Sequence, residues 1–193
     1  MPFPLFVFAL PSESAHHFDD VPTLYTGVGK VNAAAVLMQY LLASPEKPSV
    51  VVNCGTAGSP HHAPGAVVQC RGFVQRDMDV TALGFAPYQT PFDDAPVVLP
   101  ATGPVLPDLP FAVCGSGDHF VTSWPPDAPF DVAEMEAYAL ASVCARVGVP
   151  FVALKYISDG ADAAATTDWA AALDRAAVAL RGAAALMLSV PVR

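Results

Sequence analysis

The stretch DVAEMEAYALASVCARVGVPFVALKYISDGAD, residues 131–162, constrains the fold more than any other part of the chain. It places Glu-Met-Glu at the start of an apolar helix, which a Gly and a Pro end, and an apolar strand ending in Ser-Asp follows. Because ligands bind at the carboxyl ends of strands in open α/β sheets, the acids of this stretch are predicted to serve a site rather than a core. The acids are Glu134, Glu136 and Asp159, and the same prediction covers Met135 between the two glutamates.

Short apolar runs alternate with helical segments along the rest of the chain. Runs of this kind are typical of strands buried in a parallel sheet, and their alternation with helices indicates an α/β protein. The sequence therefore predicts an α/β fold with a mixed, largely parallel central β-sheet flanked by helices. The predicted strands are residues 3–10, 49–54, 67–74, 111–114 and 151–157, and the predicted helices are 33–43, 132–147 and 166–188.

Capping signals set the expected helix ends. Asp131 and Glu134 have the spacing of a capping box, so Glu134 is expected to be the capping partner rather than a catalyst. Thr167 or Asp168 is expected to cap the last helix. Residues 81–110 are rich in Pro with little periodicity, which predicts an irregular segment over the sheet edge.

Composition excludes several function classes. The chain has 193 residues, enough for one domain over residues 1–193, and is 53% hydrophobic. Its net charge of −9 disfavours nucleic acid and anionic membrane surfaces as partners. No apolar run reaches the roughly 18–20 residues of a membrane span, and the N-terminus lacks the basic region of a signal peptide. The four cysteines have no CxxC spacing, so reduced, buried thiols and a cytoplasmic location are predicted.

Three predicted strands end in turns of small or polar residues, at residues 53–58, 115–120 and 157–162. If these strands are parallel neighbours, the turns converge on one sheet edge, and their glycines allow a ligand to approach the backbone. A strand-to-helix turn also needs Gly for its own geometry. The three turns together with an acidic helix start favour a small-molecule pocket.

Six motifs follow one another in a familiar order, at residues 26–34, 53–58, 77–85, 116–120, 134–137 and 157–162. The chain resembles the 5′-methylthioadenosine/S-adenosylhomocysteine nucleosidases of the purine nucleoside phosphorylase superfamily, over nearly its whole length. Glu-Met-Glu followed by Ile-Ser-Asp is a fairly specific pair, and Asp-x-Asp-Val-Thr-Ala-x-Gly-Phe indicates the nucleosidase branch. The resemblance implies a nucleoside phosphorylase-like three-layer sandwich.

The resemblance also implies roles for three acids. Asp159 would protonate the purine at N7, Glu136 would hold the ribose hydroxyls, and Glu13 would activate water. Carboxyl groups suit these tasks, much as paired carboxylates do in glycoside hydrolysis. Each has a plainer reading: Glu136 could be a helix-start acid, Asp159 could cap a turn, and Glu13 could be an ordinary loop acid.

Further contacts are implied in the same way. Phe120 would stack on the base, the Val121 backbone would read its edge, and Met135 would pack on the sugar. Thr56 and Ser158 would orient water, sugar or Asp159. Phe120 and Met135 could equally be core residues.

No metal or redox cofactor is implied, because the paired histidines at 16–17 and 61–62 lack a ligand set around them. His119 is expected inside the pocket, touching the ligand or supporting it.

The chain departs from the family in ways that bear on function. It is short, with almost nothing between Glu13 and Thr26, so the homodimer usual in the family is less secure. Lys155 stands where relatives often have Arg. Arg71 and Arg76 are the nearest cations for a phosphate, but neither lies in the family's phosphate motif.

The favoured function is hydrolysis of a 5′-thio-substituted adenosine to adenine. A phosphorolytic enzyme, a futalosine-type hydrolase and a non-catalytic adenine-nucleoside binding protein are the alternatives.

Overall fold

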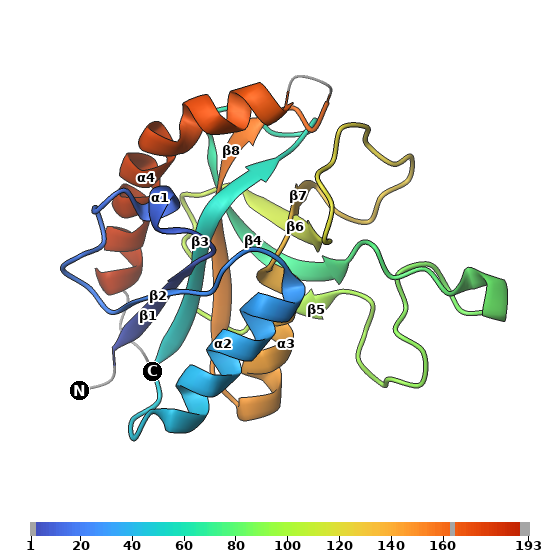
Figure 1. The fold of residues 1–193 in the computed structure, drawn as a ribbon, viewed down its shortest axis with the longest axis horizontal. Coiled ribbons are helices and arrows are strands. Elements are labelled where there is room, and N and C mark those ends of the chain that lie inside the picture. The colour runs from blue at the N-terminus through green and yellow to red at the C-terminus, as the bar shows by residue number, and fades with distance from the viewer. Residues whose placement is uncertain (1–2, 163–164, 190–193) are drawn as a thin grey trace.

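The structure is a computed structural model that describes residues 3–162 and 165–189, and an eight-stranded mixed sheet forms its centre (Figure 1). Its strands are β1 (Pro4–Phe8), β2 (Thr23–Tyr25), β3 (Val50–Gly58), β4 (Val67–Gln75), β5 (Leu99–Pro100), β6 (Phe111–Ser116), β7 (Val132–Glu134) and β8 (Phe151–Asp159). The helices are α1 (Pro11–Ser14), α2 (Lys30–Ala43), α3 (Ala137–Val147) and α4 (Ala165–Ser189), with a 3₁₀ turn η1 (Thr81–Leu83).

The strand order confirms a mixed, largely parallel sheet. Neighbours follow the order β2-β1-β3-β7-β6-β4-β5, and β8 pairs with both β3 and β4. The pairs β1–β2, β1–β3, β3–β8, β4–β6 and β6–β7 are parallel, whereas β3–β7, β4–β5 and β4–β8 are antiparallel. Because β7 joins β3 to β6 while β8 joins β3 to β4, five strands close into a ring.

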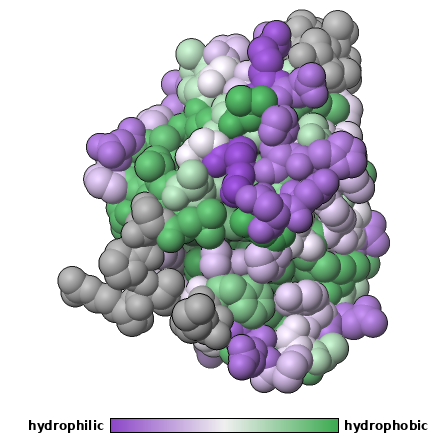
Figure 2. All heavy atoms as spheres, turned by 90° about the vertical axis from the view of Figure 1, so that its left-hand side faces the viewer, coloured by the Kyte–Doolittle hydropathy of each residue, from purple (hydrophilic) through white to green (hydrophobic). Residues whose placement is uncertain are grey.

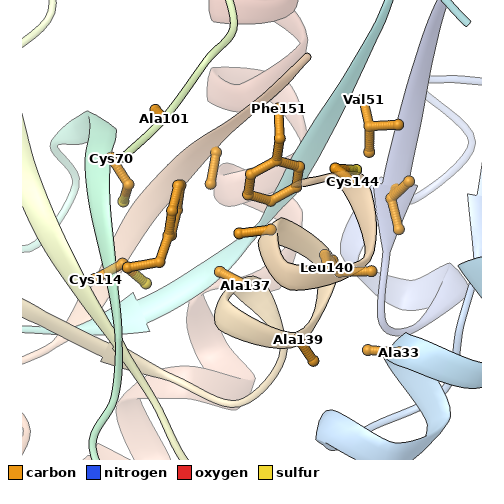
Figure 3. Packing of buried hydrophobic residues seen from close by; sticks show 14 of the residues in the cluster. Ala33, Val51, Cys70, Ala101, Cys114, Ala137, Ala139, Leu140, Cys144 and Phe151 are labelled. Atoms are coloured by element: carbon orange, nitrogen blue, oxygen red, sulfur yellow. The ribbon is translucent and has the colours of Figure 1, made fainter. Parts of the chain in front are cut away.

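Helices cover the sheet on two sides, α2 and α3 on one and α4 on the other (Figure 1). Figure 3 shows α3 presenting Leu140 and Cys144 to the sheet, close to Phe151 of β8. Each large apolar side chain that is fully buried contributes about 1.5–3 kcal/mol to folding. All four cysteines are buried and free, as the sequence predicts.

The surface is mixed in polarity where α1 and α4 lie. Figure 2 shows this side of the molecule, with strongly hydrophilic residues gathered beside hydrophobic ones. Arg181 of α4 pairs there with Asp20, at 2.6 Å between Nη2 and Oδ2. Within the described ranges, every helix is too short or too polar to cross a bilayer.

The helix predicted at residues 132–147 begins only at Ala137, so the capping-box prediction is wrong. Residues 132–134 form β7, whose Glu134 lies opposite Ser116 of β6. The Asp131 carboxylate accepts the N–H of Val113 at 2.7 Å instead of capping a helix. A tertiary partner on β6 has therefore overridden the local helical pattern.

Two other details differ from the sequence prediction. The stretch after Glu13 is not empty: it ends α1 and, after a loop, forms β2, which pairs with β1. The last helix already includes Ala165, so the expected caps Thr167 and Asp168 lie inside it. The Pro-rich segment 81–110 is irregular as predicted, apart from η1 and the short β5.

Candidate active site

A cavity of about 400 Å³ opens where the carboxyl ends of several strands meet. Gly58 at the end of β3 pairs with Asp159 at the end of β8, and Ser116 pairs with Glu134 at the ends of β6 and β7. This is the sheet edge on which the sequence predicts a pocket. Every residue predicted for the site lines this cavity: Glu13, Thr56, Phe120, Val121, Met135, Glu136, Ser158 and Asp159.

Glu13 enters the cavity from α1, and its carboxylate is buried under four hydrogen bonds. Oε2 accepts the N–H groups of Ala9 and Leu10, at 3.2 and 3.1 Å. Oε1 accepts the N–H and the hydroxyl of Thr56, at 3.3 and 3.4 Å. Burial raises the pKa of Glu13, although the Lys155 charge and these N–H groups act against the rise. A carboxyl group with a raised pKa is a stronger base in its ionised form, which suits the role of a general base.

Glu134, which lines the cavity, forms an ion pair with Lys155, with 2.9 Å between Oε2 and Nζ. Glu134 also accepts the Ser116 hydroxyl and the N–H groups of Glu136 and Ala137. Burial alone would raise the pKa of Glu134, but the Lys155 charge and these donors outweigh it and lower the pKa. Glu134 is thus a fixed anion that caps α3 from outside the helix.

Glu136 stands just before α3 and reaches the start of α2, where its Oε1 accepts the Gly29 N–H at 2.7 Å. Burial, reinforced by the negative charge of Glu134, raises the pKa of Glu136 to about 8. Glu136 and Glu134 therefore differ in protonation at neutral pH although they are two residues apart. Pairs with pKa values pushed apart in this way are typical of acid–base sites.

Asp159 lies at the end of β8 with both carboxylate oxygens occupied. Oδ2 accepts the Ser158 hydroxyl at 2.6 Å, and Oδ1 accepts the Ala161 N–H at 2.9 Å. A Cβ atom at Gly58 would come within 2.5 Å of Oδ1, so the missing side chain makes room for this acid. Asp159 does cap its turn, as its plainer reading holds, and it also lines the cavity.

The loop after β6 brings Phe120 and Val121 to the cavity, and Phe120 is 43% exposed. Arg76, at the end of β4, supports this loop: its guanidinium donates to the carbonyl oxygens of Gly117 and His119 and to the His119 ring. Phe120 is therefore a partly solvent-facing wall of the cavity rather than a core residue.

Arg76 and Trp169 are the two cavity residues outside the predicted site that bear most on its chemistry. The sequence suggests Arg76 only as a phosphate ligand and assigns no role to Trp169 of α4. Trp169 donates its indole N–H to the Thr56 hydroxyl at 2.8 Å. The signal in the sequence was a lone aromatic residue in an otherwise Ala-rich helix. His119 lines the cavity as expected, with its ring turned to Arg76.

Comparison with known proteins shows the superfamily to which the chain belongs. Residues 16–110 and 119–190 match the Phosphorylase superfamily, so the chain belongs to that superfamily. A 5′-methylthioadenosine/S-adenosylhomocysteine nucleosidase of Staphylococcus aureus (strain JH9) is 31% identical over 179 residues, which cover 82% of this chain and 77% of the relative. The chain belongs to the 5′-methylthioadenosine/S-adenosylhomocysteine nucleosidase family of this superfamily.

Solved structures share the fold. The Helicobacter pylori nucleosidase of the same name, with butyl-thio-DADMe-Immucillin-A, superposes with a TM-score of 0.86 at 21% identity, covering 97% of this chain and 98% of the other. A futalosine hydrolase mutant of H. pylori strain 26695 gives a TM-score of 0.85 at 20% identity, covering 97% and 99%. The α/β fold is thus confirmed.

Proposed function

We propose that this protein is a purine nucleosidase that hydrolyses the N-ribosidic bond of a 5′-substituted adenosine, of the methylthioadenosine or S-adenosylhomocysteine type, and releases adenine. The observation that carries the proposal is the meeting of Glu13, Glu136 and Asp159 in one nucleoside-sized cavity. These acids come from three distant parts of a chain that belongs to the nucleosidase family.

The reaction assigns each acid one task. Asp159 donates a proton to N7 of the purine, so that the C1′–N9 bond breaks and the base leaves neutral. Glu136 holds the ribose hydroxyls while positive charge develops on the sugar. Glu13 takes a proton from a water whose oxygen then forms the new bond to C1′.

The other lining residues hold the substrate in place. Phe120 stacks on the purine, and the Val121 backbone contacts its edge. Met135 packs against the sugar, while Thr56 and Ser158 orient the water and the Asp159 carboxyl. The hydrogen bonds of Thr56 to Glu13 and of Ser158 to Asp159 support this division of labour.

The groups that line the cavity around Glu13 favour hydrolysis over phosphorolysis. A phosphate there would meet the Glu13 carboxylate and the Thr56 hydroxyl, and like charges so close repel. Arg76 is the guanidinium in the cavity wall, but it already donates to the carbonyl oxygens of Gly117 and His119. This geometry suits a neutral nucleophile.

Adenine release tests the proposal. The purified protein is incubated with methylthioadenosine, S-adenosylhomocysteine and futalosine, each with and without phosphate, and the free base is measured. We expect phosphate-independent release of adenine. Release only with phosphate would support a phosphorylase, base release from futalosine alone would support a futalosine-type hydrolase, and binding without release would support a non-catalytic protein.

A homodimer and a cytoplasmic location complete the proposal. Val31, Leu83 and Phe92 are 78%, 75% and 96% exposed, and a second copy of the chain would cover such apolar side chains. Light scattering after gel filtration gives the mass directly. A monomer at all concentrations would contradict the dimer.

A further inference from the structure

The cavity holds a hydrogen-bonded chain that begins on α4. The indole Nε1 of Trp169 lies 2.8 Å from Oγ1 of Thr56, and the same Oγ1 lies 3.4 Å from Oε1 of Glu13. Trp169 is half-buried, and all three residues line the cavity. These two hydrogen bonds link α4 to Glu13, the acid that activates water in the proposed function.

The chemistry of the three groups determines which of them donates and which accepts in each hydrogen bond. An indole N–H can only donate, so the Thr56 hydroxyl must accept from Trp169. The hydroxyl has one hydrogen of its own, and Glu13 Oε1 is the acceptor that the described residues place within its reach. Trp169 therefore sets the Thr56 hydroxyl as a donor to Glu13.

Resting on the proposed function, we infer that Trp169 is a positioning residue: its indole N–H holds the Thr56 hydroxyl toward Glu13 and so aims that carboxylate at the reacting water. Without the indole N–H, the Thr56 hydroxyl is free to turn and to accept a hydrogen bond. Glu13 would then lose one of its four donors while staying buried.

Loss of that donor changes the titration of Glu13 in a known direction. Burial already raises the pKa of Glu13, and donors to the charged form oppose the rise. The other groups that interact with it are Lys155 of β8, Cys54 of β3 and Glu136 before α3. Trp169→Phe leaves all of these groups in place. A change in the pKa of Glu13 in this variant therefore reports the loss of the indole N–H alone.

The test uses Trp169→Phe, which keeps an aromatic ring in the cavity and removes only the donor. We expect kcat to fall about three- to tenfold, the rate equivalent of one neutral hydrogen bond, with KM nearly unchanged. The acid limb of the pH–rate profile should move to higher pH. The double variant with Thr56→Val should be no slower than Thr56→Val alone, since both changes break the same link.

A second readout does not need activity. The chain contains four glutamates, at positions 13, 46, 134 and 136, so protein labelled with ¹³C at the Glu carboxyl gives few resonances to assign. The Glu13 resonance should titrate at higher pH in Trp169→Phe, and also in Thr56→Val, than in the wild type. If the wild type releases no adenine, the proposed function fails while this titration still tests the link. An unchanged Glu13 titration in either variant would overturn the inference.

Discussion

Lys155 of β8 and Glu134 of β7 form an ion pair whose side chains are 2% and 3% exposed, and Glu134 also lines the cavity. The Lys155 charge acts against the rise in the pKa of both Glu13 and Glu136. One buried cation therefore acts on the protonation of two acids of the site. Removing it should affect both the stability and the protonation of the acids.

We expect Lys155→Met to lower the free energy of unfolding by about 3–5 kcal/mol, because it leaves Glu134 as an unpaired buried charge. Urea denaturation measures the change. Lys155→Arg keeps the charge and serves as the matched control. The double variant with Glu134→Gln should regain most of the lost free energy of unfolding. A loss below about 1 kcal/mol in Lys155→Met would show that the ion pair contributes little to stability.

Asp159→Asn should abolish most of the turnover while the protein stays folded. The variant loses the proton donor to N7, and a positioned general acid contributes at least about 100-fold to a rate. Its amide oxygen can still accept the Ala161 N–H, so the melting temperature should change little. Adenine release and thermal unfolding are measured side by side, and wild-type rates in the variant would refute the acid assignment.

Glu136→Gln should lower kcat/KM at neutral pH by roughly two- to tenfold, because Glu136 with its pKa of about 8 is protonated there and a neutral hydrogen bond contributes about 0.5–1.5 kcal/mol. The amide still accepts the Gly29 N–H, so α2 and α3 should stay joined. Steady-state kinetics with methylthioadenosine measure the loss. If the variant changed thermal stability alone, Glu136 would be a structural acid.

The same variant should flatten the dependence of stability on pH. The folded protein raises the pKa of Glu136 from 4.5 to about 8. Between these pH values the folded state keeps a proton that the unfolded state has released, so stability falls as the pH rises through this range. Melting temperatures of the wild type should therefore drop more steeply from pH 5 to about pH 8 than those of Glu136→Gln. Parallel curves would contradict the raised pKa.

Gly58→Ala should displace the Asp159 carboxyl group, since the new Cβ would lie 2.5 Å from Oδ1. We expect activity to fall sharply. Gly182→Ala is the control: a Cβ at Gly182, within α4, meets nothing within 4 Å, and the exchange should stabilise the protein by about 0.5–1 kcal/mol. Full activity of Gly58→Ala would mean that the position of Asp159 does not matter.

Five strands, β1, β3, β4, β6 and β8, could be predicted from sequence because each is a short apolar run between turn residues, whereas β2, β5 and β7 could not. β3 and β8 also end in the turns that build the cavity. The parallel pairing of β3 with β8 then brought Gly58 and Asp159 together, as a shared sheet edge requires. The eight predicted site residues lie in one cavity for this reason, while their roles stay predictions.

The segment at Glu134–Glu136 could not be predicted in the same way. Its residues favour a helix locally, but Ser116 and Lys155, which lie 18 and 21 residues away, hold Glu134 in a strand. Trp169 was missed for a similar reason, because its partner Thr56 is 113 residues distant. Contacts of this length leave no periodicity in the sequence.

The most direct measurement is a crystal structure of the Asp159→Asn variant grown with methylthioadenosine. We expect density for an intact nucleoside, with the purine between Phe120 and residue 159 and the ribose hydroxyls on Glu136. A nucleoside bound elsewhere, or an empty cavity at saturating ligand, would contradict it.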